Sequence, residues 1–310
     1  ERLFRIRPEA IAYDLHPDYL STRYALERSR REGLPALAVQ HHHAHVAACM
    51  ADNGLPGDQP VIGVAFDGTG YGEDGAIWGG EFLVADYRGF QRPHHLAYFP
   101  LPGGDAAIRR PARTALALLW SLGVDWEDWL APVDGLCYEE RQALRIQLEH
   151  GLNTVQTSSM GRLFDAAAAL AGVRQEVNFE AQAAIEFEAA ADRSESGAYH
   201  FEVREAGVEA GEAIRALLAD VRSGTGIPIL SARFHNGVAG MVLDVCTELR
   251  GRTGLKAVAL TGGVWQNMLL LERSVRLLRE AGFEVYLHQR VPANDGGVSL
   301  GQAMVAAARI

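Results

Sequence analysis

Residues 40–45 read QHHHAH, and residues 61–74 read VIGVAFDGTGYGED. The first stretch places His41 and His45 four residues apart, so on a helix their side chains lie about 5–6 Å apart on one face. His42 and His45, three residues apart, are also within reach of each other. Two imidazoles at this spacing form a platform for zinc or iron, and the positive end of the helix dipole favours a neutral, ligating His41.

Carboxylates elsewhere in the chain would complete such a metal site. Asp67 ends the apolar run VIGVAF, and strand ends of α/β proteins point into the cleft. Asp295 stands in Asn-Asp-Gly-Gly, directly before the last predicted helix. We predict that His41, His45, Asp67 and Asp295 bind one divalent metal, zinc or iron rather than a hard cation. The alternative is a solvated histidine helix start, a turn aspartate and a helix-capping aspartate.

Two glycine-rich turns indicate an anion near this site. DGTGYG (67–72) lies within a predicted β-hairpin, and Thr261-Gly262-Gly263 follows a strand and precedes a helix. Neither matches the Walker loop or the dinucleotide-binding fingerprint. Both let backbone N–H groups approach an anion, and the second aims a helix N-terminus at it. Two such turns, separated by a helical block, predict a nucleotide cleft between two related lobes.

The remaining chain is typical of an α/β protein. Strands at 10–15 and 35–40 alternate with helices, which favours a mostly parallel sheet, and Ser21 or Thr22 caps the first helix, which ends at Gly33. Further helices are expected at 108–122, 137–150, 161–171 (after a Thr-Ser-Ser cap), 180–191, 209–221 and 231–254, with an edge strand at 200–205 and a strand–turn–helix–strand unit at 256–288. We expect a first lobe of residues 1–60 plus 290–310, and a second of 61–289 with a helical insert at about 85–160.

Composition limits the function classes. The chain of 310 residues is 48% hydrophobic and 22% charged, as in ordinary soluble domains. Its net charge of −10 repels polyanions, so we expect no nucleic-acid partner. Cys49, Cys137 and Cys246 lack paired spacing, which predicts reduced thiols and a cytoplasmic protein. Neither a membrane-spanning apolar run nor a signal peptide is visible in the sequence, and no membrane partner is expected.

Six strings carry a family resemblance: YDLHPDYLSTRYA (13–25), QHHHAHVAA (40–48), AFDGTGYGEDGAIWGGEF (65–82), SSMGRLFDA (158–166), LTGGVWQN (260–267) and VPANDGG (291–297). Together they resemble the C-terminal transferase portion of the HypF carbamoyltransferases of [NiFe]-hydrogenase maturation, over essentially the whole chain. The resemblance implies the two-lobed ATPase fold of actin and hexokinase, with ribonuclease H-like lobes. It also implies that the first lobe lacks its initial hairpin, and that an upstream carbamoyl-adenylate-forming domain would precede Glu1.

The resemblance further implies roles for individual residues. His41, His45 and Asp295 would bind the metal, with Asp67 at a more variable position. Asp67 would also contact the nucleotide, and Gly68 and Thr69 would lie by the phosphates. The ribose and adenine would contact Asp165, Gln182, Gly262, Gly263 and Asn267. Where the family usually reads Glu-Gly-Gln, this chain has Glu180-Ala181-Gln182. We expect the Ala181 methyl group to crowd the nucleotide and disturb the contact of Gln182.

The implied reaction is carbamoyl transfer from carbamoyl-adenylate to the C-terminal cysteine of HypE. The implied cofactors are the divalent metal and the ATP-derived AMP moiety, with magnesium as a further cation. No GxSxG elbow is present, so the acceptor thiol would come from the partner. His235 is considered as a base for that thiol, against a simpler role as a polar residue at a helix start. The rival functions are a small-molecule O-carbamoyltransferase and a nucleotide-dependent docking module without catalysis; the negative charge disfavours a tRNA-modifying transferase.

Overall fold

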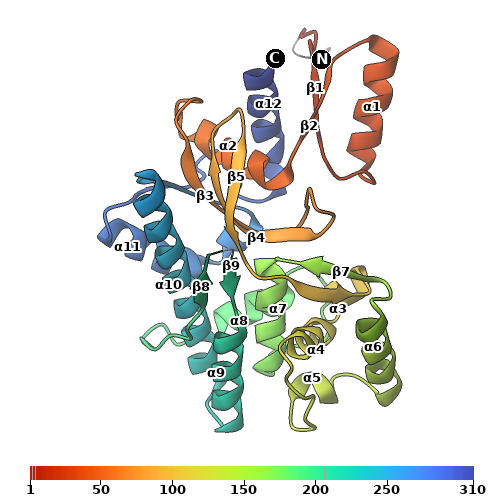
Figure 1. The fold of residues 1–310 in the computed structure, drawn as a ribbon, viewed down its shortest axis with the longest axis vertical. Coiled ribbons are helices and arrows are strands. Elements are labelled where there is room, and N and C mark those ends of the chain that lie inside the picture. Colours follow the sequence, from red (N-terminus) through yellow and green to blue (C-terminus); the bar gives the residue numbers. More distant parts are fainter. Residues whose placement is uncertain (2, 4, 206) are drawn as a thin grey trace.

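The computed structural model describes residues 1, 3, 5–205 and 207–310, and it shows an α/β protein, as predicted (Figure 1). Its main sheet is mixed and has seven strands. In spatial order they are β11 (Glu284–Tyr286), β10 (Ala257–Thr261), β3 (Val61–Tyr71), β4 (Ile77–Ala85), β7 (Thr154–Thr157) and β6 (Phe99–Pro102), with β5 (Phe90–His95) pairing β4.

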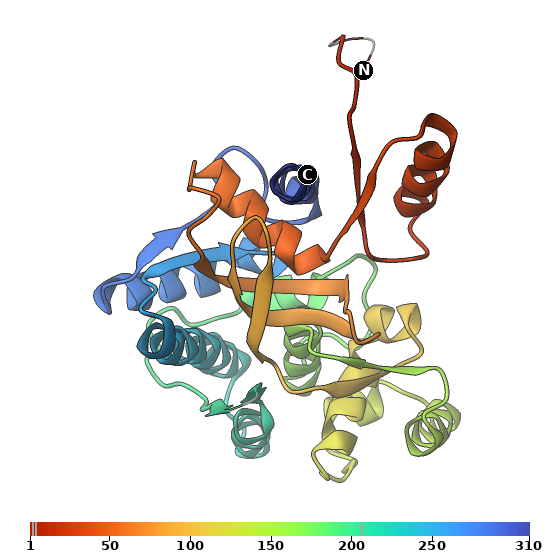
Figure 2. The same ribbon diagram turned by 45° about the horizontal axis from the view of Figure 1, so that its top comes forward.

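Helices cover both faces of this sheet (Figures 1 and 2). The longer ones are α1 (Leu20–Glu32), α2 (His41–Asp52), α4 (Pro111–Ser121), α6 (Tyr138–His150), α7 (Met160–Leu170), α8 (Gln182–Ala189), α9 (Gly211–Arg222), α10 (Ile227–Thr253), α11 (Met268–Glu280) and α12 (Val298–Arg309). Short helical turns are α3 (Asp105–Arg109), α5 (Ala131–Asp134), η1 (Gly263–Gln266) and η2 (Asp295–Gly297). Among the described residues, none of the helices has both the length and the apolar character needed to cross a bilayer.

The central strand β3 is buried on both faces, which explains its continuous apolar sequence. Successive side chains of a strand point to opposite faces. Val61 and Ala65 therefore belong to a smaller core under α2 and α12, whereas Ile62 and Val64 belong to the larger core on the opposite face. The close pairing of α2 with α12 requires Gly301, because a Cβ there would lie 1.8 Å from the Ala44 carbonyl oxygen.

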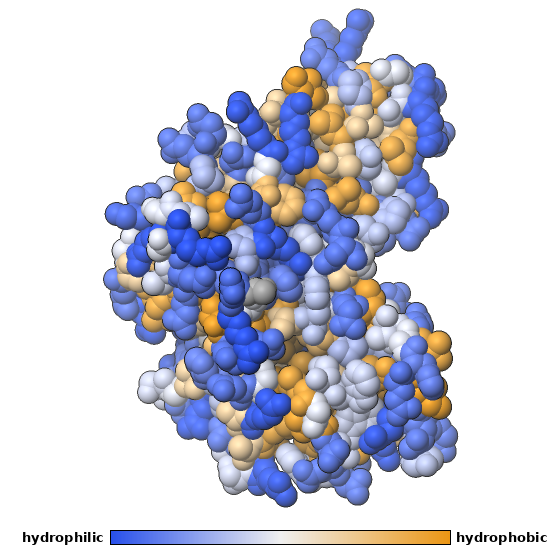
Figure 3. Space-filling view, viewed as in Figure 1, coloured by the Kyte–Doolittle hydropathy of each residue, from blue (hydrophilic) through white to orange (hydrophobic). Residues whose placement is uncertain are grey.

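The N-terminal residues form a small unit beside α12, in which β1 (Ile11–Asp14) and β2 (Ala36–Val39) pair in parallel and α1 connects them (Figure 1). Gly33 ends α1 at a φ of 70°, as predicted. The predicted Ser21 or Thr22 cap is wrong. Tyr19 precedes the helix without a side-chain cap, and the Thr22 hydroxyl donates to the Asp14 carbonyl instead. Apolar side chains reach the surface over this unit (Figure 3).

Several predicted elements have different bounds. The strand–turn–helix–strand unit is confirmed, and β10 and β11 pair in parallel. The expected edge strand at 200–205 is shorter, β8 (Glu202–Arg204), and pairs only with β9 (Gly207–Glu209). The predicted start of the longest helix at 231 is wrong, because Pro228 is accommodated in the first turn of α10. The helix expected at 180–191 is reduced to α8.

Candidate metal and nucleotide site

The four predicted ligands come together from three separate segments. His41 and His45 lie on α2, whose first turn is capped by Gln40 through the His43 backbone N–H. Asp67 comes from β3 and Asp295 begins η2. One ligand atom of each of these four residues lies within 4.8 Å of the other three. Individual distances are 3.0 Å from His45 Nε2 to Asp67 Oδ2 and 3.5 Å from His41 Nε2 to Asp295 Oδ1.

The donor set fits a divalent transition metal. His41 Nε2, His45 Nε2 and Asp67 Oδ2 are buried, yet they hydrogen-bond to no described residue. Bonds of 2.0–2.1 Å around a tetrahedral ion place neighbouring ligand atoms about 3.3 Å apart, close to the separations here. Asp295 is the exception in burial, with a side chain that is 68% exposed. Two imidazole nitrogens and two carboxylate oxygens suit zinc or iron.

The pKa shifts of the four residues indicate that the cluster favours a bound positive charge. Burial lowers the pKa of His41, but the neighbouring carboxylates of Asp14, Asp295 and Asp67 outweigh it and raise that pKa well above the usual value. The pKa of His45 is likewise raised against its burial, by Asp295 and Asp67. The two imidazoles also lower the pKa of Asp67 and of Asp295. In the absence of a cation, protons on the imidazoles balance the carboxylates, and a bound metal would replace those protons.

Contacts behind the cluster orient two of its members. Asp14 Oδ2 lies 2.8 Å from His41 Nδ1, so the imidazole is held with Nε2 toward the other ligands. Asp67 Oδ1 accepts the Gly68 N–H at 2.8 Å and the Gly263 N–H at 3.3 Å, which leaves Oδ2 for the cluster. The role of Asp14 was not predicted from the sequence. Its position at the end of a strand could have indicated it, because strand ends of α/β proteins point into the cleft.

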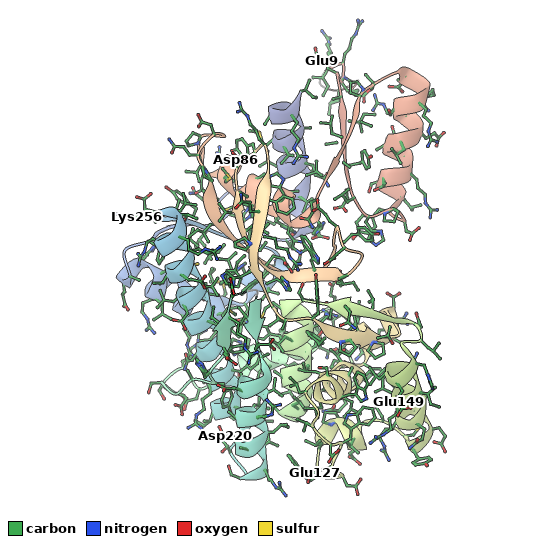
Figure 4. The ribbon with its side chains drawn as sticks, viewed as in Figure 1. Glu9, Asp86, Glu127, Glu149, Asp220 and Lys256 are labelled. Atoms are coloured by element: carbon green, nitrogen blue, oxygen red, sulfur yellow. The ribbon has the colours of Figure 1, made fainter. Side chains whose placement is uncertain are left out.

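The other two histidines of the run do not join the cluster. His42 is fully buried, and its Nδ1 lies 3.3 Å from the Gln40 amide nitrogen, while burial lowers its pKa. The centroids of His42 and His45 are 6.4 Å apart, so the predicted approach of these two rings is loose. His43 faces away from the cluster, and its Nε2–H donates to the Asp86 carbonyl at 2.6 Å; Asp86 is labelled in Figure 4.

The predicted β-hairpin is confirmed, because β3 and β4 pair antiparallel, but the stretch DGTGYG does not form its turn. β3 continues to Tyr71, and the chain reverses only over residues 72–76. The register with β4 shifts between Phe66 and Gly70, so the stretch Asp67–Thr69 is an irregularity within the strand. Such bulges re-aim side chains beside functional sites. The irregularity turns Asp67 into the cluster and leaves Gly68 and Thr69 on the cleft wall.

A cleft of about 720 Å³ opens beside the four ligands. Its lining residues include five of those predicted to contact a nucleotide: Asp67, Gly68, Thr69, Gly263 and Asn267. Three others lie behind the wall. Asp165 is 3% exposed, and Gln182 is bonded to Asn178 N–H and to Glu186 within its own segment. Gly262 has a φ of 103°, and a Cβ there would lie 2.2 Å from the Phe66 carbonyl oxygen, so this glycine allows β10 to meet β3.

Ala181 on the cleft wall has an unusual backbone conformation. Ala181 has a φ of 59°, a left-handed conformation that glycine adopts more readily than alanine. The predicted departure from Glu-Gly-Gln therefore falls at a position where the backbone itself favours glycine.

Arg162 also lies on the cleft wall, and no role was predicted for it from the sequence. It lies in the first turn of α7. The cap of that helix is Ser159, as the Thr-Ser-Ser motif predicted.

His235 has neither of its two predicted roles. It lies within α10 rather than at its start, and it is fully buried. Its Nδ1–H donates to the Ser231 carbonyl at 2.8 Å, so its Nε2 accepts from the Asn267 amide at 2.8 Å. Burial lowers the pKa of His235 to about 4. This neutral imidazole therefore holds Asn267 on the cleft wall, and it has no direct access to an acceptor thiol.

Comparisons with known proteins place this arrangement in a family. Residues 63–302 match the family model described as "Carbamoyltransferase, Kae1-like Domain, second subdomain", and residues 1–52 match "HypF Kae1-like domain". The chain belongs to the HypF family. It is 39% identical to a carbamoyltransferase HypF homolog of Cupriavidus necator, covering 96% of this chain and 78% of the relative.

Two further similarities support the family and the fold. Carbamoyltransferase HypF of Rhizobium leguminosarum is 42% identical over 96% of this chain and 38% of its own length. A crystal structure of full-length HypF in the phosphate- and nucleotide-bound form superimposes with a TM-score of 0.91 at 43% identity, covering 98% of this chain and 47% of that one. The predicted α/β fold is therefore confirmed as that of the HypF family. The chain spans about two fifths of the length of most curated relatives that it matches.

Proposed function

We propose that this chain transfers a carbamoyl group from carbamoyl-adenylate to the C-terminal cysteine thiol of HypE. The observation that carries the proposal is the convergence of His41, His45, Asp67 and Asp295 within 4.8 Å at one end of a nucleotide-sized cleft. HypF family membership supplies the reaction class. The free thiols of Cys49, Cys137 and Cys246 support the predicted reducing, cytoplasmic compartment.

The residues of the chain would act mainly by binding and orientation. The four ligands would hold zinc or iron, which supplies Lewis-acid polarisation of an oxygen when bound. Asp14 holds His41 in its ligating orientation, and the Gly68 and Gly263 N–H groups hold Asp67. The Gly68–Thr69 stretch and the start of α7 form the wall against which the adenylate would lie. Positioning of the two reactants can lower the barrier by up to about 7–11 kcal/mol.

The covalent step is a displacement at the carbamoyl carbon. The acceptor thiolate forms the S–C bond, the C–O bond to the phosphate breaks, and AMP leaves with the electron pair. The thiol proton passes to solvent, because the buried His235 cannot receive it. In this proposal the donor comes from an upstream carbamoyl-adenylate-forming domain, and the partners include neither nucleic acid nor membrane.

Mass spectrometry of an acceptor peptide tests this function directly. The chain is incubated with pre-formed carbamoyl-adenylate and a peptide of the HypE C-terminus, and we expect the cysteine to gain one carbamoyl group. A peptide with serine in place of that cysteine is the control for transfer to oxygen. Nucleotide binding without any transfer would favour the docking-module function, and carbamoylation of a small hydroxyl compound alone would favour an O-carbamoyltransferase. Either outcome contradicts the proposal.

A further inference from the structure

Arg162 is a buried cation with too few partners. Its side chain is 2% exposed, yet Nε and Nη1 hydrogen-bond to no described residue. Its one ionic contact is from Nη2 to Asp165 Oδ2, at 3.2 Å. A guanidinium offers five N–H donors, and burying a charge is costly unless it is paired and hydrogen-bonded. One carboxylate therefore leaves most of this donor capacity unused.

The guanidinium lies at the wall of the cleft, next to the metal ligands. A Cβ built on Gly68 would be 3.5 Å from Arg162 Nη2, and one built on Gly161 would be 2.9 Å from the Gly68 Cα. The first turn of α7 thus packs directly against the residue that follows Asp67. The Ser159 hydroxyl strengthens this junction through the Asp67 and Gly68 carbonyls. Arg162 and the four-ligand cluster flank the same irregular stretch of β3.

The charge distribution of the cleft makes this position unusual. Four acidic residues line it: Asp67, Glu180, Glu188 and Asp295. Among the described residues that line the cleft, Arg162 is the only lysine or arginine. Its place in the first turn of α7 is unfavourable by itself, because the helix dipole already makes that end positive. The guanidinium and the helix end together form a positive site that an anion would stabilise.

We infer that Arg162 binds the phosphate of the adenine nucleotide, together with the N-terminal turn of α7. This role rests on the proposed function and extends it. Arg162 supplies the positive charge that stabilises AMP as the leaving group. When the carbamoyl C–O bond breaks, the electron pair moves onto a phosphate oxygen, and the fixed positive charge lowers the energy of that product without a proton transfer. Arg162 would then discriminate nucleotides from nucleosides.

The competing explanation is that Arg162 only supports Asp165. Burial raises the pKa of Asp165, and the charge of Arg162 opposes that rise. In that case, loss of Arg162 would disturb the ribose side of the cleft and weaken nucleoside and nucleotide alike. The phosphate explanation instead predicts a loss confined to phosphorylated ligands. The two explanations therefore differ in the ratio of two dissociation constants.

Isothermal titration calorimetry of the full chain with AMP and with adenosine measures that ratio. For Arg162→Gln we expect AMP to bind about 10- to 100-fold more weakly, as for loss of a charged hydrogen bond, with adenosine changed less than about threefold. Arg162→Lys keeps the charge and should retain part of the preference for AMP. The matched control is Arg193→Gln, which removes an exposed arginine paired with Glu272 at 2.9 Å.

Further variants keep the result unambiguous. Asp165→Asn should preserve the preference for AMP, because Arg162 remains in place. Thermal unfolding identifies any variant that fails to fold, and Arg162→Lys then carries the test. Equal weakening of AMP and adenosine, no change in either, or a wild-type chain without preference for AMP would overturn the inference. No acceptor is present, so failure of transfer to HypE leaves this result unaffected.

Discussion

The two ends of the cleft differ in the kinds of atoms that line them. The proposed metal end (His41, His45, Asp67 and Asp295) consists of side-chain atoms, three of them buried and without hydrogen bonds to the described part of the chain. The proposed nucleotide end (Gly68, Arg162, Ala181, Gly263 and Asn267) consists largely of backbone and small residues, with one arginine. We therefore expect mutation of a ligand to abolish metal binding, whereas most mutations at the nucleotide end should change the shape of the cleft only slightly.

Removing both imidazoles should have the largest effect. His41→Ala with His45→Ala eliminates two of the four donors, so we expect metal content to fall close to zero and transfer to fall by about 1000-fold, as for loss of several kcal/mol of stabilisation. Elemental analysis and the peptide assay measure the two quantities. His43→Gln is the control on the same helix, because His43 faces the Asp86 carbonyl. Undiminished transfer in the double variant would show that the reaction does not need this cluster.

Asp14→Asn tests whether the metal end is preorganised. A neutral amide can still contact His41 Nδ1, but it no longer stabilises the imidazole by charge. We expect metal affinity to fall by about 10- to 100-fold, measured by competition with a chelator. Asp18→Asn, an exposed residue of the same loop that contacts Arg23, provides the control. An unchanged metal affinity would mean that the 2.8 Å contact with His41 is only structural.

Asp52→Asn tests how the exposed ligand Asp295 is placed. Asp52 ends α2, the helix of the two histidines, and accepts N–H groups of Gln289, Arg290 and Val291 in the loop that leads to Asp295. We expect the free energy of unfolding to fall by about 1.5–3 kcal/mol at pH 7, measured in urea, with weaker metal binding. Exposed Asp58 is the control position.

The same variant has a defined pH dependence. Burial raises the pKa of Asp52, but the three backbone N–H groups outweigh it and the folded pKa is lowered. The contribution of Asp52 is therefore present above its unfolded pKa of about 3.9 and is lost as the pH falls through the lower folded value. The stability gap between wild type and Asp52→Asn should shrink below about pH 4. A gap independent of pH would assign the effect to packing.

Ala181→Gly should have the smallest effect and the opposite sign. Relief of the left-handed backbone outweighs the added freedom of glycine in the unfolded chain, so we expect the protein to gain about 0.5–1 kcal/mol of stability. AMP affinity should also rise, because the methyl group leaves the cleft wall. Ala184→Gly, on the same wall but within α8, should instead lose about 1 kcal/mol. Equal losses in both variants would contradict the strain at Ala181.

The two ends also differed in how far they could be predicted. The histidine spacing is a local property of one helix, and the sequence alone placed His41 and His45 on one face. The apolar run of β3 before Asp67 was equally accessible, as was the glycine end of α1. Predictions were wrong where local signals were ambiguous: glycine residues 68 and 70 suggested a turn, but a strand with a register shift accommodates them.

The sequence by itself determined the family, the α/β class and the four residues that meet at the metal end. These features depend on periodicity and on local motifs, which can be recognised in the sequence without the tertiary structure. Only the tertiary structure decided that Asp14 stands behind His41 and that Gln182 and Asp165 lie behind the cleft wall. It also decided that Arg162 is the one lysine or arginine among the described residues that line the cleft. Those facts depend on packing between segments far apart in sequence, such as α7 against β3, and packing of that kind leaves no periodic trace in the chain.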